Sequence, residues 1–183
     1  AAFLIVGALI SGSTGLEILN VGMNPTRIGV LYVLQKMGAN IEIHNQRVQS
    51  GEPCADLIIY PSKLKGIKLD GSIIPNIIDE IPIISIAAAF ADGDTTIGDA
   101  AELRVKESDR LHAVSTGFKK LGVMHENFDD GMKIYGKSGM LSLPKSISLE
   151  SYDDHRIAMS FLIAGMRCSK PIIVKDCNNI FTS

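Results

Sequence analysis

Apolar and polar positions form alternating blocks along the chain, and one type of block recurs. Three segments each begin with an apolar, small-residue stretch that is typical of a buried helix, then pass through a polar turn into a short strand. They are residues 1–21, 83–100 and 159–177, and their helical parts lie roughly 75–80 residues apart. Similarity at a fixed period predicts a repeated structural unit.

A second kind of helix follows the first two of these segments. Residues 24–43 and 104–126 each predict a helix that ends at a glycine, Gly38 or Gly122, and is followed by a strand. Both helices carry apolar residues at helical spacing, namely Ile28, Leu31, Leu34 and Met37 in one and Leu111, Val114, Phe118 and Leu121 in the other. Further strand-like stretches lie at 55–60, 132–135 and 146–149.

One repeat unit is therefore predicted to contain a helix, a strand, a second helix and two strands. The whole chain, 1–183, is expected to be one α/β lobe with units at about 1–80, 81–150 and 151–183, the last incomplete. Helices such as residues 85–91 are apolar almost all round, which places the helices inside and the sheets outside. A solenoid is an alternative, but a closed pseudo-threefold lobe accounts better for a third unit that stops short.

Composition narrows the class of protein. Of the 183 residues, 46% are hydrophobic and 21% charged, as in globular domains, and the net charge of −2 predicts no bulk attraction to nucleic acid or to an anionic membrane. The three cysteines have no CxxC spacing, so we expect neither a disulfide framework nor a zinc site, and a reducing cytoplasm fits better. The apolar residues 1–10 are interpreted as a buried helix in a chain whose true start is missing.

The strongest polar cluster is Glu102–Arg110, in which six of nine residues are charged. If a helix starts near it, Arg104, Glu107 and Arg110 lie along one side of that helix. Cations beside the N–H groups of a helix terminus can bind phosphate or carboxylate. The alternative is a solvated helix start with surface ion pairs.

Two acidic clusters each precede an apolar helix, Asp79-Glu80 before Pro82 and Asp153–Arg156 before residues 157–164. Their carboxylates could include a general base with a shifted pKa, or they could simply be helix N-caps. His155 has three possible roles: a base, a hydrogen-bonding neighbour of the site, or a polar surface residue. The sequence contains no HExxH metal motif, no Gly-rich phosphate loop and no nucleophile elbow.

Repetition connects these clusters, because pseudo-symmetry would bring the helix N-termini to one end of the lobe. The residues gathered there would be Asp79, Lys106, Glu107, Arg110 and Arg156. Acid–base groups beside three cations suit a doubly anionic substrate and proton transfer without a metal.

The sequence resembles the 5-enolpyruvylshikimate-3-phosphate (EPSP) synthase family over nearly its whole length. The matching strings are NPTRIG (24–29), LQKMGANIEI (34–43), DEIPIISIAAAFADG (79–93), ELRVKESDRL (102–111) and DHRIAMSF (154–161). RVKESDR and DHRxAMxF together are highly specific, and the related transferase acting on a UDP-amino sugar shares the fold without RVKESDR. The resemblance implies two lobes of inside-out, pseudo-threefold βαβαββ units around a cleft, of which this chain is most of one lobe; the second lobe of the same polypeptide is missing.

The resemblance also implies an activity: transfer of the enolpyruvyl group of phosphoenolpyruvate to the 5-hydroxyl of shikimate 3-phosphate, with release of phosphate. This reaction of the shikimate pathway to aromatic amino acids runs by addition and elimination with no cofactor and no metal, in a cytoplasmic enzyme expected to be a monomer when complete. Matched by position, Asp79 handles the 5-hydroxyl proton, Glu107 acts at the methylene carbon of phosphoenolpyruvate, and Lys106 contacts shikimate 3-phosphate.

In the same matching, Arg110 and Arg156 hold the carboxylate and phosphate of phosphoenolpyruvate, and Asp154 and His155 are near neighbours. Some members of the family have Asn in place of Glu102, so we do not assign a substrate contact to this residue. Alternatives are a transferase acting on a UDP-sugar acceptor and a non-catalytic repeat lobe that serves as a binding module. We expect the chain to be inactive alone and to have neither nucleic acid nor membrane as a partner.

Overall fold

The first third of the chain folds in the predicted order of helix, strand, helix, strand, strand. The computed structural model describes residues 1–12 and 15–182. The elements are α1 (Ala2–Ser11), β1 (Leu16–Gly22), α2 (Gly29–Lys36), β2 (Asn40–Gln49) and β3 (Glu52–Tyr60). Both β1 and β2 pair antiparallel with β3, which gives a sheet of order β1-β3-β2.

The second third repeats this order, with one additional strand and a long helical run at its start. Its elements are β4 (Lys68–Leu69), the 3-10 helix η1 (Gly71–Ile73), α3 (Ile74–Ile77), η2 (Ile78–Glu80), α4 (Ile81–Ala89), β5 (Gly93–Ile97), η3 (Ala101–Val105), α5 (Arg110–Leu121), β6 (His125–Phe128) and β7 (Gly131–Gly136). The sheet order is β4-β5-β7-β6, with β4 parallel to β5 and the other neighbours antiparallel.

The last part of the chain repeats the beginning of that pattern. It contains β8 (Ile147–Glu150), α6 (His155–Gly165), β9 (Ile172–Lys175) and η4 (Asn178–Thr182). β8 is parallel to β9 across α6, as β4 is parallel to β5 across α4. The inside-out repeat fold is therefore confirmed, whereas the unit boundaries near residues 80 and 150 stay a prediction.

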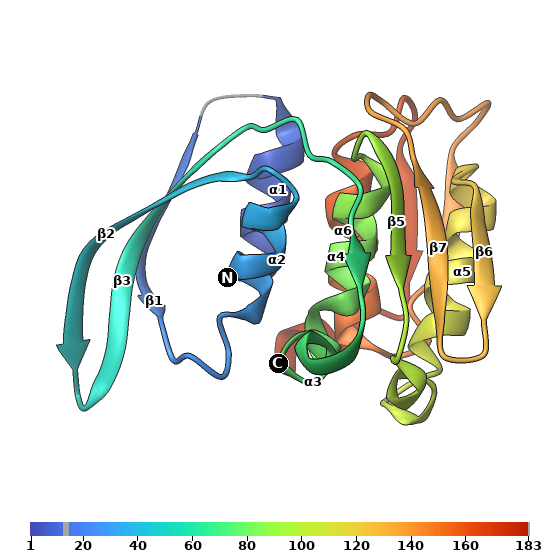
Figure 1. The fold of residues 1–183 in the computed structure, drawn as a ribbon. Coiled ribbons are helices and arrows are strands. Elements are labelled where there is room, and N and C mark those ends of the chain that lie inside the picture. The colour runs from blue at the N-terminus through green and yellow to red at the C-terminus, as the bar shows by residue number, and fades with distance from the viewer. Residues whose placement is uncertain (13–14, 183) are drawn as a thin grey trace.

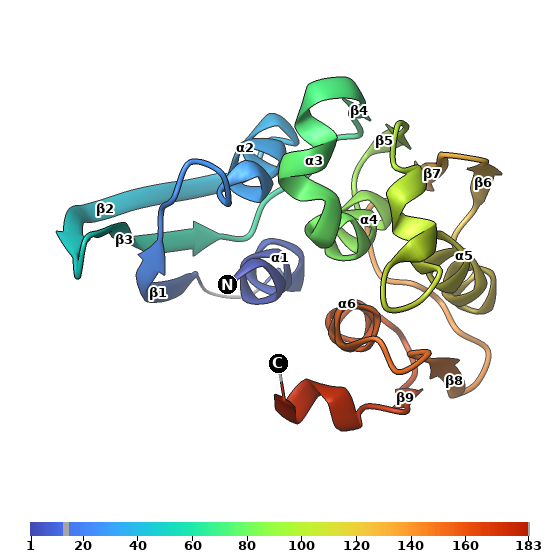
Figure 2. The ribbon, with the colours of Figure 1, turned by 90° about the horizontal axis from the view of Figure 1, so that it is seen from below.

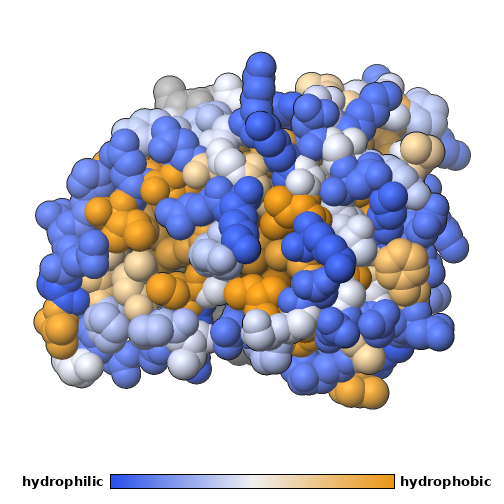
Figure 3. Space-filling model, viewed as in Figure 1, coloured by the Kyte–Doolittle hydropathy of each residue, from blue (hydrophilic) through white to orange (hydrophobic). Residues whose placement is uncertain are grey.

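The helices α1, α4 and α6 lie side by side in the middle of the lobe, with the sheets outside them (Figure 2). Every residue of α4 is buried, and so are the residues of α1 from Ile5 to Ile10, as their uniformly apolar sequences predict. All three helices run in the same direction, so their N-terminal ends lie at one end of the lobe and their C-terminal ends at the other (Figure 1). The space-filling view shows hydrophobic residues in the middle of one face, with hydrophilic side chains around them (Figure 3).

One helical run in the described part of the chain, Gly71–Ala89, is long and apolar enough to cross a membrane by length and composition. It comprises η1, α3, η2 and α4, and 61% of its apolar window is buried inside the lobe. The run also carries Asp79 and Glu80 in its middle. These features are typical of a core helix in a folded domain.

Two of the predicted helices begin later than expected. α2 starts at Gly29, because Asn24 accepts hydrogen bonds from the backbone and hydroxyl of Thr26 and forms a turn first. α5 starts at Arg110, and residues 101–105 form a separate 3-10 helix. The expectation that one continuous helix aligns Arg104, Glu107 and Arg110 along one side is therefore wrong.

Candidate active site

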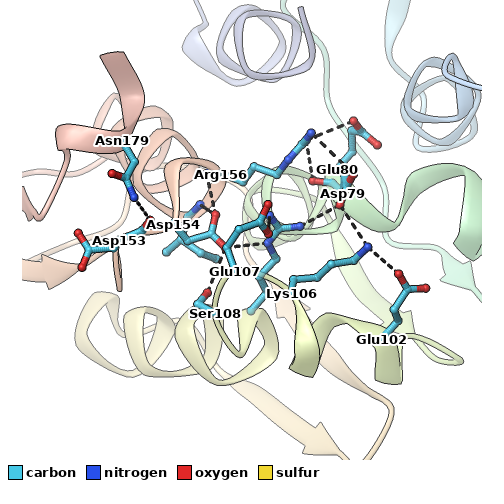
Figure 4. A network of polar contacts seen from close by, with 12 residues as sticks. Asp79, Glu80, Glu102, Lys106, Glu107, Ser108, Asp153, Asp154, Arg156 and Asn179 are labelled. Carbon is cyan, nitrogen blue, oxygen red and sulfur yellow. Dashed lines mark hydrogen bonds and ion pairs between the residues drawn. The ribbon is translucent and has the colours of Figure 1, made fainter. Parts of the chain in front are cut away.

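Figure 4 shows a polar network that includes Asp79, Glu107 and Asp154. Arg110, the first residue of α5, contacts all three of these carboxylates, and its side chain has 0% exposure. Nε donates to Oδ2 of Asp154 at 2.8 Å, Nη1 to Oδ1 of Asp79 at 2.9 Å, and Nη2 to Oε2 of Glu107 at 2.5 Å. A buried guanidinium requires such partners, because an unpaired charge away from water is strongly destabilising.

Asp79 contacts two further cations besides the central guanidinium. Its Oδ1 lies 3.7 Å from Nζ of Lys106, and its Oδ2 lies 3.8 Å from Nη2 of Arg156. Nη1 of Arg156 also donates to the backbone carbonyl of Asp79 at 3.0 Å and to Oε1 of Glu80 at 3.4 Å. Lys106 is held from the other side by Oε1 of Glu102 at 2.6 Å. Asp79 is thus the carboxylate at which the three cations of the network meet.

Asp154 connects this network to α6. Its Oδ1 accepts the backbone N–H groups of Arg156 at 2.9 Å and Ile157 at 3.4 Å, so it is a true helix N-cap. Its Oδ2 accepts the hydroxyl of Ser108 at 3.1 Å and the Nε–H of Arg110. The capping interpretation of this cluster is therefore correct, and the same carboxylate also binds the guanidinium of Arg110.

The capping interpretation is wrong for Asp79-Glu80. No side-chain hydrogen bond caps the start of α4, because the 3-10 turn η2 runs directly into the helix. The Asp79 carboxylate is left to face the cations instead. Helix N-terminal ends and acid groups nevertheless share the same end of the lobe, as pseudo-symmetry predicts (Figure 1).

The cations determine the charge state of the carboxylates. Burial raises the pKa of Asp79, but Arg156, Arg110 and Lys106 together outweigh burial and lower this pKa below its usual value. Burial likewise opposes ionisation of Asp154, and the hydrogen bond and charge of Arg110 bring its pKa below the usual value. The hydrogen bond to Glu102 raises the pKa of Lys106. Both aspartates are therefore ionised and the lysine is charged at neutral pH.

A hollow of about 380 Å³ lies beside this network, and Asp79, Glu80 and Arg156 form part of its wall. The remaining lining residues are Thr26, Arg27, Pro75, Asn76 and Ile78. Sequence reasoning singled out neither Arg27 nor Asn76 as a site residue. Arg27 belongs to the NPTRIG string, which is the signal that could have found it; Asn76 lies in an apolar stretch without such a signal.

The structure brings the five predicted residues Asp79, Lys106, Glu107, Arg110 and Arg156 into one network, and their roles stay a prediction. We call these five residues, together with Glu80, Glu102 and Asp154, the acid–cation network. His155 begins α6 and, within the described residues, its side chain makes no hydrogen bond or ion pair. Sequence reasoning missed Ser108, which donates to Asp154, and it did not foresee that Glu80 of the Asp79-Glu80 cluster pairs with Arg156. Arg104 is not part of the network.

Arg104 instead anchors the segment that carries the site. It donates to the carbonyl of Asp129 at 2.7 Å and to the carbonyl of Phe128 at 2.9 Å, and pairs with Asp109 at 3.1 Å. Asp109 in turn caps α5 through the backbone N–H of His112. The interpretation of this cluster as mere solvated surface therefore fails, since half of its charges hold backbone or lie buried. No group of His, Cys, Asp or Glu side chains among residues 1–12 and 15–182 is arranged to hold a metal ion.

The fold, with helices inside and sheets outside, is the fold of the enolpyruvyl transferases. The family model of EPSP synthase (3-phosphoshikimate 1-carboxyvinyltransferase) matches residues 1–183, and the chain belongs to this family.

Curated relatives support the assignment over the full chain. A 3-phosphoshikimate 1-carboxyvinyltransferase of Magnetococcus marinus is 48% identical over 183 residues, and one of Legionella pneumophila is 50% identical. Each alignment covers 100% of this chain but 41% of the relative, so the chain spans about two fifths of their length.

Solved structures show the same partial coverage. An EPSP synthase from Acinetobacter baumannii superposes with a TM-score of 0.94 at 42% identity, covering 99% of this chain and 42% of that one. The enolpyruvyl transferase NikO from Streptomyces tendae superposes with a TM-score of 0.70 at 16% identity, covering 96% of this chain and 38% of that one. This second likeness concerns the fold alone.

Proposed function

We propose that this chain is one lobe of an enzyme that transfers the enolpyruvyl group of phosphoenolpyruvate to the 5-hydroxyl of shikimate 3-phosphate and releases phosphate. The observation that carries the proposal is the meeting of three cations with Asp79 and Glu107 where the central helices begin, in a chain of this family. The active enzyme would be a cytoplasmic monomer that also contains a second lobe and needs no cofactor.

In this proposal the two carboxyl groups divide the proton transfers. Ionised Asp79 accepts the 5-hydroxyl proton as the hydroxyl oxygen bonds to C2 of phosphoenolpyruvate, while Glu107, which must have left Arg110 and entered the step as the neutral acid, delivers its proton to the C3 methylene. The product of this addition is a tetrahedral intermediate with a methyl group. Glu107 then removes a methyl proton, the C2–O bond to phosphate breaks, and the enol ether forms. The lowered pKa keeps Asp79 in the ionised form that can accept a proton.

Lys106 is proposed to bind shikimate 3-phosphate, and Arg110 and Arg156 are proposed to hold phosphoenolpyruvate. Arg156 and Lys106 are partly exposed, at 25% and 23%, whereas Arg110 has no exposed side-chain surface. A substrate anion therefore reaches Arg110 only when a carboxylate moves aside. Glu107, which is 54% exposed, is the partner free to move, and this movement would bring it towards the substrate as a proton donor.

The test uses the full-length protein that contains this lobe. Glu107→Gln and Asp79→Ala are each expected to lower kcat by about 10²- to 10⁴-fold, because each removes a proton-transfer group. Phosphate release from the two substrates measures kcat, and circular dichroism confirms that the variants are folded.

Asp94→Asn is the matched control, because Asp94 is also a partly exposed, ion-paired carboxylate, but its partner is Lys133 on β7. Its kcat should equal that of the unsubstituted enzyme. Near-normal turnover by Glu107→Gln or Asp79→Ala would remove that residue from the mechanism. A panel that includes UDP-sugar acceptors tests the substrate, and phosphate release with only a UDP-sugar would contradict the proposed acceptor.

A further inference from the structure

A second cavity lies at the end of the lobe opposite the acid–cation network. It measures about 540 Å³ and is bounded by the loop after β3 and by the C-terminal ends of α1, α4 and α6. These segments lie at the top of Figure 1, whereas α3 and the start of α4 lie at the bottom. Figure 3 shows hydrophilic side chains at this upper end. The cavity therefore does not share its wall with the proposed active site.

The wall of this cavity consists of an apolar floor and a polar, charged rim. Leu9, Ile10, Leu64 and Phe90 supply an apolar floor of buried side chains. The rim carries three cationic side chains, the hydroxyls of two serines and one carboxylate, namely Lys63, Lys65, Arg167, Ser62, Ser138 and Asp92. Cations thus outnumber acids around an apolar floor.

The three cations have no acidic partner within the described residues, in contrast to every cation of the acid–cation network. The Nε of half-buried Arg167 is inaccessible to solvent and has no hydrogen-bond acceptor among residues 1–12 and 15–182. Nη1 of Arg167 lies 3.2 Å from the position that a Cβ on Gly12 would occupy, so this glycine makes room for the guanidinium. A buried donor without an acceptor is costly, and turning the guanidinium of Arg167 into the cavity towards a bound anion would remove that cost.

These cations are not needed as caps for the helix ends. The carbonyl of Leu9 in α1 accepts the backbone N–H of Ser62, and that of Ala89 in α4 accepts the backbone N–H of Lys137. In α6 the carbonyl of Ala164 accepts the backbone N–H of Arg167. Because backbone donors already satisfy these carbonyls, the side-chain charges remain available to a ligand.

We propose that this cavity binds a small organic anion that carries an aromatic or other apolar body. Its phosphate or carboxylate would be held by Lys63, Lys65 and Arg167, and its body would lie on the floor formed by Leu64 and Phe90. The proposal does not depend on the catalytic function, because none of these residues belongs to the acid–cation network.

Isothermal titration calorimetry of the 183-residue chain with phenyl phosphate tests the proposal. We expect saturable binding with a Kd below about 1 mM, and at least about tenfold weaker binding of inorganic phosphate, which lacks the apolar body, and of benzyl alcohol, which lacks the charge. Lys65→Gln and Arg167→Gln should each weaken phenyl phosphate about tenfold.

Two controls locate the binding. Lys119→Gln removes an exposed charge on α5 that does not line the cavity, and it should leave the Kd unchanged. Arg156→Gln in the acid–cation network should also leave it unchanged, whereas loss of binding in Arg156→Gln alone would place the anion at the other end and overturn the proposal. Absence of saturable binding, or inorganic phosphate binding as tightly as phenyl phosphate, would also overturn it. Lys65 is exposed, so its substitution separates loss of binding from loss of folding.

Discussion

At the scale of single residues, Arg110 and Asp154 decide the geometry of the site. Both side chains have 0% exposure and are joined by a 2.8 Å hydrogen bond, so each is the indispensable partner of the other. Breaking one buried ion pair by removing a single partner costs about 3–5 kcal/mol, because the other charge is left unpaired. The same two residues also start α5 and cap α6, so the site and the packing of these helices depend on each other.

The pH dependence of stability should report on these carboxylates. The pKa values of Asp79 and Asp154 are lowered by folding, so their contribution is present above the unfolded value of about 3.9 and is lost as the pH falls through the folded values. We expect the free energy of unfolding to fall below about pH 4. Urea unfolding from pH 3 to 7 should show a deficit for Asp154→Asn that is largest at pH 7 and shrinks in acid. A deficit independent of pH would contradict this origin, and Asp94→Asn serves as the control.

Substitution of Arg156 or Arg110 should change the KM for phosphoenolpyruvate more than the KM for shikimate 3-phosphate in the full-length enzyme. Arg156→Ala, at a partly exposed position, is expected to raise the KM for phosphoenolpyruvate about tenfold and to affect shikimate 3-phosphate less, because a charge-assisted contact is lost. Arg110→Ala should show the same order together with a loss of stability of about 3–5 kcal/mol. Steady-state kinetics and urea unfolding measure these effects, and the reverse order of the KM changes would mean that the assignment is misplaced.

At the scale of elements, the contact between α5 and α6 places the site residues relative to one another. Gly117 lies in the middle of α5, and a Cβ at this position would stand 2.0 Å from Cζ of Phe161 in α6. Phe161 is 1% exposed, so its ring lies enclosed in the core. The close approach of the two helices therefore requires glycine here, although glycine is a poor helix former.

Gly117→Ala is accordingly expected to destabilise the lobe by about 2 kcal/mol or more, although Ala would favour an isolated helix by about 1 kcal/mol. Thermal or urea unfolding measures the change. Thr116→Ala, one residue away on a partly exposed position, should stay within about 0.5 kcal/mol. A stabilising effect of Gly117→Ala would show that α5 and α6 do not pack as described, and Phe161→Leu should relieve part of the clash.

At the scale of the whole molecule, the charge of the network limits what this chain does alone. Five carboxylates surround the three cations, namely Asp79, Glu80, Glu102, Glu107 and Asp154. Such a site has an excess of negative charge, so it attracts an anionic substrate only when further cations face it. The chain spans 41% of the length of its curated relatives, and the remainder of such a polypeptide is where those cations are expected.

The 183-residue chain by itself is therefore expected to bind shikimate 3-phosphate weakly or undetectably and to show no turnover. Calorimetry with shikimate 3-phosphate and a phosphate-release assay with both substrates measure this, and the full-length enzyme is the positive control. Substantial turnover by the 183-residue chain would contradict the two-lobe proposal.

The repeat and the buried central helices followed from the sequence, because each rests on a local pattern. Uniformly apolar stretches such as residues 83–91 can only be buried, and Gly122, with φ of 73°, ends α5 as its position predicts. The residues of the acid–cation network were predicted because equivalent positions in successive repeats return to the same end of the lobe. The RVKESDR and DHRxAMxF strings then indicated the family.

Tertiary structure alone decided what each charge does. Asp79 and Asp154 both precede an apolar helix in sequence, yet Asp154 caps its helix and Asp79 does not, because η2 continues into α4 without a break. Arg104 and Arg110 stand six positions apart, but one binds backbone carbonyls at Phe128 and Asp129 while the other is buried among carboxylates. The partners that decide the roles of Arg104 and Arg110 lie far away in the chain, and periodicity does not encode such partners.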